Sequence, residues 1–127
     1  LKQYPHLVLL RLDAPLTFIN IQYFKDYVLS HTPADTQTVI LDAGPVSHVD
    51  STAIEGLKDL IRTLEEKQMH FLICDVIGPV RDAFHRTGFM ELLTEEHMFL
   101  DLNEAVTYVT THKGGKFKSY AMQHSED

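Results

Sequence analysis

Cysteine, basic charge and long apolar runs are all scarce in this sequence. Its 127 residues include one cysteine, Cys74, so no disulfide can form within the chain, and a reducing compartment fits it better than an oxidising one. No apolar run approaches the ~20 residues that a membrane-spanning helix needs. Eleven lysines and arginines stand against eighteen aspartates and glutamates, and the resulting net charge of -7 disfavours nucleic acid as a partner.

The motifs of common enzyme and cofactor sites are missing as well. The eight histidines show no His-x-x-x-His or other short ligand spacing, so the sequence predicts no metal site. There is no Gly-x-Ser-x-Gly elbow and no glycine-rich phosphate-binding loop. His48, Asp50 and Ser51 are the residue types of a hydrolytic triad, but neighbours entering a helix rarely adopt its geometry. We therefore expect no enzyme and no cofactor, and a small hydrolase using His48 and Ser51 is the remaining enzyme hypothesis.

The length suits a single domain with one core. We expect residues 1–112 to form this domain and residues 113–127, which include Gly114-Gly115 and scattered lysines, to form a flexible tail. Cys74 lies in an apolar run, which predicts a small buried side chain rather than a nucleophile. The chain begins at Leu1 rather than at methionine, so we expect it to be a piece of a longer protein.

The stretch from Val39 to Leu64 is the strongest structural signal. Val39–Leu41 is a short, β-branched apolar run that predicts a buried strand, and Gly44-Pro45 ends it. Thr52-x-x-Glu55 fits a capping box at the start of the following helix. Good N-cap residues stand in a row at Asp50, Ser51 and Thr52, and the apolar face of the helix repeats at Ile54, Leu57, Ile61 and Leu64.

The segments before this stretch predict two strands and a helix. Leu7–Asp13 and Leu16–Ile19, separated by Ala14-Pro15, are expected to form a hairpin-like pair. A helix is expected from Ile21 to about Ser30, with Asn20 as its N-cap and with Ile21, Phe24 and Val28 on its apolar face. Pro33 ends that helix, because the residue before a proline is disfavoured in the α region.

The segments after the long helix repeat the alternation of strand and helix. Met69–Val76 predicts a buried strand, and Met98–Leu100 predicts a last short one. Gly78-Pro79 starts a helix that ends at Gly88 as a left-handed cap, and Phe89–Leu93 is expected to be a hydrophobic connector. A final helix is expected with Leu102, Ala105, Val106 and Val109 facing inward and with Asp101 or Asn103 as its cap.

This alternation predicts an α/β fold. We expect a mixed sheet of four to five strands covered by about four helices. Right-handed crossovers would place the helices on one face of its parallel part.

Ser51 would lie beside the first free N–H groups of the long helix. A helix N-terminus tolerates negative charge through its dipole and unpaired donors, so a phosphate on Ser51 would be accepted there, although Asp50 would repel it somewhat. The helix N-termini near Ser51 and Val80 are also generic anion sites. Helix capping alone is the simpler interpretation of Asp50, Ser51 and Thr52.

The motif Asp50-Ser51-Thr52-Ala53 resembles the Asp-Ser-[Ser/Thr]-Gly loop of the STAS domain, a module shared by SulP-type anion transporters and bacterial anti-sigma factor antagonists. The departure from that motif is Ala53 in place of glycine. In the antagonists the serine after the aspartate is phosphorylated by a partner kinase, and Ser51 is the matching position. The resemblance covers the chain from about Leu7 to His112.

Two further segments resemble the transporter branch of this family. They are Arg11-x-Asp13-Ala14-Pro15-Leu16-x-Phe18-x-Asn20-x-x-Tyr23-Phe24 and Val80-Arg81-Asp82-x-Phe84-x-x-x-Gly88. The antagonists usually carry a Gly-Glu-Leu-Asp-like turn in place of the first segment.

The resemblance implies the STAS fold and a cytoplasmic, C-terminal regulatory and interaction domain of a SulP-type secondary anion transporter for sulfate, bicarbonate or a carboxylate. It implies action by protein contacts rather than catalysis, at the cytoplasmic face of the inner membrane, with the isolated domain soluble. The implied partners are the carrier's own transmembrane domain, a second copy or a cytosolic protein. The alternative is a stand-alone partner-switching module phosphorylated on Ser51. The candidate contact residues are Pro45, His48, Asp50, Ser51 and Thr52, with Asn20 and Arg81 as secondary candidates.

Overall fold

A computed structural model of the chain describes residues 6–111, and the elements below lie in that range. They are β1 (Leu7–Arg11), α1 (Ile21–Ser30), β2 (Thr38–Asp42), α2 (Ser51–Glu66), β3 (His70–Cys74), α3 (Gly78–Arg86), α4 (Phe89–Leu93), the 3-10 turn Glu95–His97, β4 (Met98–Phe99) and α5 (Leu102–Thr111). None of the helices within residues 6–111 combines the length and the apolar composition that a membrane crossing requires. The expected tail, 113–127, lies outside the described residues.

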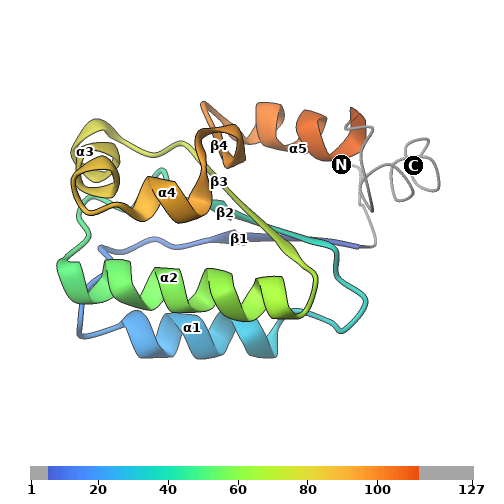
Figure 1. Cartoon of the computed structure of the whole chain (residues 1–127), viewed down its shortest axis with the longest axis horizontal. Coiled ribbons are helices and arrows are strands. Elements are labelled where there is room, and N and C mark those ends of the chain that lie inside the picture. The colour runs from blue at the N-terminus through green and yellow to red at the C-terminus, as the bar shows by residue number, and fades with distance from the viewer. Residues whose placement is uncertain (1–5, 112–127) are drawn as a thin grey trace.

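The four strands form a parallel sheet in the order β1-β2-β3-β4 (Figure 1). Each crossover between neighbouring strands contains one or more helices, as parallel strands require. The fold class is therefore α/β, as predicted. The central strand β2 is buried along residues 38–41, which explains its nearly continuous apolar sequence.

The helices cover both faces of the sheet, whereas the sequence predicted helices on one face of its parallel part. The larger core packs side chains of α1 and α2, which lie side by side in Figure 1, together with those of α3 and α4 against one face. On the other face Ile40 and Leu72 pack against Ala105 and Val109 of α5. The crossover rule governs only helices between paired strands, and α5 follows the last strand, so it is free to cover the second face.

The expected hairpin is wrong. Leu16 forms only a single parallel bridge, to Val49, and residues 17–20 form a turn. The side-chain Oδ1 of Asn20 accepts the N–H of Thr17 at 2.9 Å, and the N–H of Ile21 bonds to the Thr17 carbonyl at 2.9 Å. Because this turn replaces an antiparallel strand, the described sheet is parallel throughout rather than mixed.

Most helix boundaries agree with the sequence. α1 spans the predicted Ile21–Ser30. α3 begins at Gly78-Pro79, and Gly88 follows it with a left-handed φ of 77°, the backbone conformation that glycine adopts most easily. Of the two expected caps of α5, Asp101 is the one used, since its Oδ1 accepts the N–H of Glu104 at 2.9 Å.

Three local expectations need correction. Asp50 is the N-cap of α2, so Thr52 lies inside the first turn and the expected capping box with Glu55 does not form. Asn20 is the N-cap residue of α1, as expected, but its side chain makes no capping bond, because it is engaged with the turn before that helix. Phe89–Leu93, expected as a hydrophobic connector, is a short helix, α4.

The two long helices approach each other closely at Gly56. A Cβ atom placed there would lie 2.3 Å from Cγ1 of Ile21 and 3.0 Å from its Cδ1. Gly56 is thus the position at which α1 and α2 contact each other most tightly among the described glycines. This contact fixes the start of α1, and with it the turn before α1, relative to α2.

Candidate functional site

The loop from β2 to α2 holds its polar side chains outward by burying its apolar ones. Val46 and Val49 are buried, with 2% and 7% of their surface exposed. The loop begins with a turn in which the Asp42 Oδ1 accepts the N–H of Gly44 at 3.0 Å. Between the buried valines, Ser47 and His48 are exposed.

Asp50 joins this loop to the turn before α1. Its Oδ1 accepts the N–H of Ala53 at 2.8 Å, which caps α2, and its Oδ2 accepts the N–H of Phe18 at 2.9 Å. These two backbone donors, first that of Ala53 and then that of Phe18, lower the pKa of Asp50. Asp50 is therefore held as a carboxylate that ties together two loops distant in sequence.

Asn20 shapes the turn that Asp50 holds. Its Nδ2 donates to the Pro15 carbonyl at 2.8 Å, and its Oδ1 accepts the Thr17 N–H. The turn exposes two large apolar side chains, since Phe18 and Ile19 have 68% and 79% of their surface accessible. Apolar side chains this exposed at the tip of a turn are typical of contact sites when they lie together.

Most of the predicted contact residues therefore lie on the two segments that Asp50 ties together. Ser51 and Thr52, the first two residues of α2, are exposed, as is His48, while Pro45 and Asp50 are half-buried. We use the term contact surface for Phe18, Ile19, His48, Ser51 and Thr52. Sequence reasoning missed Phe18 and Ile19 because it assigned them to a strand.

The hydrolase hypothesis is not favoured by this geometry. An orienting acid in a triad accepts a hydrogen bond from the catalytic histidine. Within residues 6–111, the side chain of Asp50 accepts the backbone N–H groups of Ala53 and Phe18, and no hydrogen bond joins it to His48. Asp50 acts as a structural tie in this site.

Arg81 takes no part in the hydrogen bonds that Asp50 makes with Phe18 and Ala53. It is on α3, where its Nη2 donates to the Val76 carbonyl at 2.9 Å. This bond supports the loop from β3 to α3. Arg81 is exposed, so it remains available for a contact of its own.

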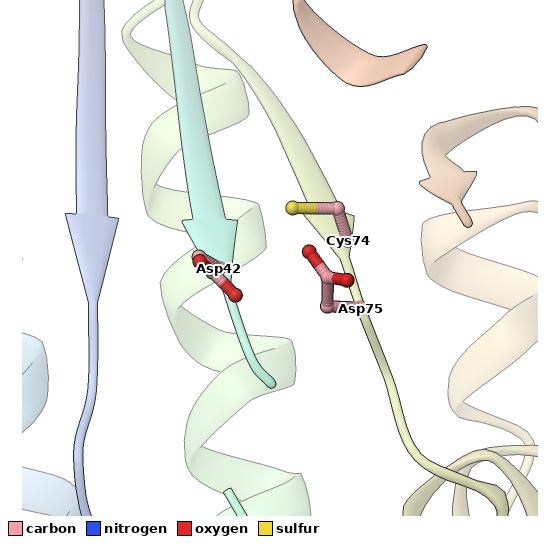
Figure 2. Close-up of side chains that lie close together, drawn as sticks. All are labelled: Asp42, Cys74 and Asp75. Atoms are coloured by element: carbon pink, nitrogen blue, oxygen red, sulfur yellow. The ribbon is translucent and has the colours of Figure 1, made fainter. Parts of the chain in front are cut away.

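A polar cluster that sequence reasoning did not identify lies at the carboxyl ends of β2 and β3. Asp42, Cys74 and Asp75 have potential ligand atoms within 4.8 Å of one another, and Figure 2 shows their side chains grouped at the strand ends. Burial, followed by the charge of Asp42, raises the pKa of the Cys74 thiol to about 12. The cluster thus offers two carboxylates and a protonated thiol, which is a weak donor set for a metal.

Next to this cluster is an open hollow of about 390 Å³, lined by Arg11, Asp42, Gly44, Pro45 and Asp75. The Arg11 Nε donates to the Asp13 Oδ1 at 3.0 Å, and this hydrogen bond raises the pKa of Arg11. Pro45 connects the hollow to the loop that leads to Ser51. The sequence carried only part of the signal, since Asp42 directly follows the predicted strand Val39–Leu41 whereas Asp75 lay inside the predicted strand Met69–Val76. In the structure both aspartates lie at the carboxyl ends of neighbouring parallel strands, where sites form in α/β sheets.

Comparisons with known proteins agree on one family. The sequence model of the STAS domain matches residues 1–105. The chain is 32% identical over 124 residues to sulfate transporter 4.1, chloroplastic, of Arabidopsis thaliana, and the match covers 84% of this chain but 18% of that protein. It therefore spans about a fifth of the length of this relative.

Two solved structures show the same fold. The STAS domain of a SulP transporter from Vibrio cholerae superposes with a TM-score of 0.71 at 17% identity, covering 99% of this chain and 89% of that one. A putative anti-sigma factor antagonist from Thermotoga maritima superposes with a TM-score of 0.72 at 16% identity, covering 85% and 91%. At these identities the structural similarity supports the assignment of the fold and nothing beyond it.

Proposed function

Because this chain belongs to the STAS domain family and its relatives are SulP-type sulfate transporters, we propose that it is the C-terminal regulatory and interaction domain of a secondary anion transporter. It acts at the cytoplasmic face of the inner membrane through protein contacts rather than catalysis. Its first partner is the transmembrane part of the same carrier. Sulfate is the leading substrate because the relatives are named as sulfate transporters, with bicarbonate or a carboxylate as alternatives.

The observation that carries this proposal is the double role of the Asp50 carboxylate. One side chain fixes both the start of α2 and the turn that exposes Phe18 and Ile19. A regulator acts only through unequal contacts with two states of its target, and unequal contacts require a surface of defined shape. The Asp50 tie gives the contact surface such a shape, because it holds the turn that carries the apolar side chains and the helix start that carries the hydroxyl groups in fixed positions.

Transport by the complete carrier tests this role. In the full-length protein, Ile19→Asp places a charge in the contact surface at a side chain that makes few contacts within its own domain. We expect sulfate uptake to fall about tenfold if Ile19 contributes roughly 1.4 kcal/mol to the active state. Leu100→Asp is the matched control, since Leu100 is 70% exposed and lies beside β4 instead.

Equal uptake by Ile19→Asp, Leu100→Asp and the wild type would refute a role for this surface. Surface expression of the carrier and the melting temperature of the isolated domain need to be unchanged in both variants. With that established, a loss of uptake confined to Ile19→Asp reports a lost contact rather than a lost fold.

A second candidate function has one specific observation in its favour. Ser51 is exposed at the first position of the 16-residue helix α2, where a phosphate would meet free N–H donors. A stand-alone partner-switching module would receive phosphate there from a serine kinase. The neighbouring Asp50 carboxylate opposes this modification through repulsion.

Phosphate incorporation distinguishes the two candidates. The partner-switching function requires that a serine kinase labels the wild-type chain on Ser51 and leaves Ser51→Ala unlabelled. Thr52→Ala is the control, because it removes the neighbouring exposed hydroxyl and should label normally. Labelling that persists in Ser51→Ala, or that never occurs, would exclude this second function.

A further inference from the structure

Two histidines that are far apart in the sequence lie close together beside β3. Strand β4 pairs with β3 only at Ile73 and Cys74, so the first half of β3, which begins at His70, is not paired with β4. The 3-10 turn before β4 contacts β3 and ends at His97. The imidazole rings of His70 and His97 are 6.4 Å apart between their centroids. The topology of the sheet therefore creates a pair of imidazoles that no short sequence motif could reveal.

Both histidines and a carboxylate line one cavity. This cavity has a volume of about 130 Å³, and Glu65, near the carboxyl end of α2, forms part of its wall together with His70 and His97. Ile61 and Met69 belong to the apolar part of the same wall. Two histidines and a glutamate, with water in the fourth position, are a common donor set for zinc. The cavity has room for an ion and for the water that would complete its coordination.

The hydrogen bonds of His97 determine which of its ring nitrogens can bind a metal. The Nδ1 atom lies 3.0 Å from the carbonyl oxygen of Leu93, and because a carbonyl oxygen can only accept, Nδ1 carries the proton. In the neutral ring Nε2 then holds the lone pair that a metal ion requires. Histidine ligands usually donate their other N–H to a backbone carbonyl or a carboxylate in this way, which fixes the tautomer and the ring orientation.

The backbone beside His97 has an unusual conformation. Thr94 has a φ of 71° and a ψ of 150°, a region that β-branched residues rarely occupy. Its hydroxyl lies 3.1 Å from the His97 Nδ1, and its carbonyl accepts the N–H of His97 at 3.1 Å. Conformations of this kind persist where the surrounding structure holds them, and they are concentrated at ligand sites. Here the strained residue positions His97 against β3.

We propose that the chain binds one zinc ion through His70, His97 and Glu65, with water as the fourth ligand. Imidazoles on one zinc ion, with Zn–N bonds of about 2.0–2.1 Å, have ring centroids about 5 Å apart, so the two rings must approach by about 1 Å. The three ligand groups are not gathered within 4.8 Å of one another, but Glu65 is exposed and can rotate toward the rings. Imidazole ligands favour zinc over magnesium and calcium. This inference concerns the chain alone and does not depend on its role in a carrier.

Calorimetric titration of the 127-residue chain with zinc chloride tests the proposal. We expect saturable binding of one ion per chain at concentrations between roughly 1 µM and roughly 1 mM, and none with magnesium or calcium. His70→Ala and His97→Ala should each raise the dissociation constant about tenfold or more, and Glu65→Gln should raise it less. Glu66→Gln and His31→Gln are the matched controls, because both residues are exposed and neither lines the cavity, so both variants should bind zinc as the wild type does.

A chain without saturable zinc binding up to roughly 1 mM would overturn the proposal. So would binding that both His70→Ala and His97→Ala retain at full affinity, since the ion would then occupy other histidines. Binding that is lost in Asp42→Asn would place the ion at the strand-end cluster and would also overturn it. The exposed position of Glu65 allows its variant to fold even if the two histidine variants do not. Thermal melting gives a second readout, because zinc should raise the melting temperature of the wild type more than that of Glu65→Gln.

Discussion

The carboxylate of Asp50 accepts the backbone N–H of Phe18, a residue 32 positions earlier in the chain, at a distance of 2.9 Å. The same carboxylate caps α2 through the N–H of Ala53. One side chain therefore sets the position of the turn that exposes Phe18 and Ile19 relative to the start of α2.

Asp50→Ala should lower the urea midpoint of unfolding and increase hydrogen exchange at the amide of Phe18. The low pKa of Asp50 means that its contribution to stability is fully present above the unfolded-state pKa of about 3.9 and is lost as the pH falls through the lower native value. The difference between wild type and Asp50→Ala should therefore shrink in strong acid. Thr52→Ala is the control, because it removes no capping bond. If Asp50→Ala had the same urea midpoint as the wild type, the two hydrogen bonds of Asp50 would not stabilise the domain.

Much of the fold could be predicted from the sequence, because the pattern of apolar residues reports directly on burial. Ile54, Leu57 and Leu64 recur at helical spacing, and all are buried in α2. In the strand before them three of the four buried residues, Val39, Ile40 and Leu41, are apolar, and the fourth is Thr38. Both elements are therefore determined by information contained in short windows of sequence.

The turn before α1 could not be predicted in this way. Leu16 is buried while Phe18 and Ile19 are exposed, so the apolar run that suggested a strand combines one core side chain with two surface side chains. The conformation depends on side-chain hydrogen bonds of Asn20 and on the Asp50 carboxylate. Such bonds depend on three-dimensional position and leave no periodic pattern.

The cluster at the strand ends was hidden for a related reason. Asp42 is paired with Cys74 across β2 and β3, and this register brings the side chains together. Register is set by how the whole sheet packs, so the separation of these residues along the chain gave no indication of the contact. The proximity of Pro45 to this cluster was hidden in the same way.

Gly56→Ala should destabilise the domain by about 1–3 kcal/mol, although alanine favours helix more than glycine does. The added Cβ would lie 2.3 Å from Cγ1 of Ile21, so α1 and α2 would have to separate. Urea denaturation measures this cost. Combining Gly56→Ala with Ile21→Ala removes the clash, so the double variant should be less destabilised than the sum of the two single variants. If the destabilisation of the double variant equalled the sum of the two single values, Gly56 and Ile21 would not be in the close contact described.

Cys74 should react with alkylating reagents roughly 1,000-fold more slowly in the native domain than in the unfolded chain near neutral pH. The raised thiol pKa, from 9.0 to about 12, reduces the reactive thiolate by about that factor, and burial reduces access further. Labelling followed by mass spectrometry, with and without urea, gives the two rates. Rapid labelling of the native domain would show that the thiol is ionised or exposed.

His85 should remain protonated at higher pH than an ordinary histidine. Its Nε2 lies 2.8 Å from the Glu95 Oε2 and its Nδ1 lies 2.9 Å from the Arg81 carbonyl oxygen, and both partners are acceptors. A neutral imidazole has one N–H and can satisfy one of them, whereas the imidazolium satisfies both. The hydrogen bond to Glu95, followed by that to the Arg81 carbonyl, accordingly raises the pKa of His85.

The resulting contribution to stability is complete below the unfolded-state pKa of about 6.5 and is lost as the pH rises through the higher native value. Titration of the His85 ring signals by nuclear magnetic resonance should show the raised pKa, and Glu95→Gln should bring it down toward 6.5. Glu96→Gln is the matched control, because it removes a neighbouring carboxylate and leaves the hydrogen bond from Glu95 to His85 intact. If Glu95→Gln left the titration of His85 unchanged, the ion pair could not be the cause of the shift, and the bond to the Arg81 carbonyl would have to account for all of it.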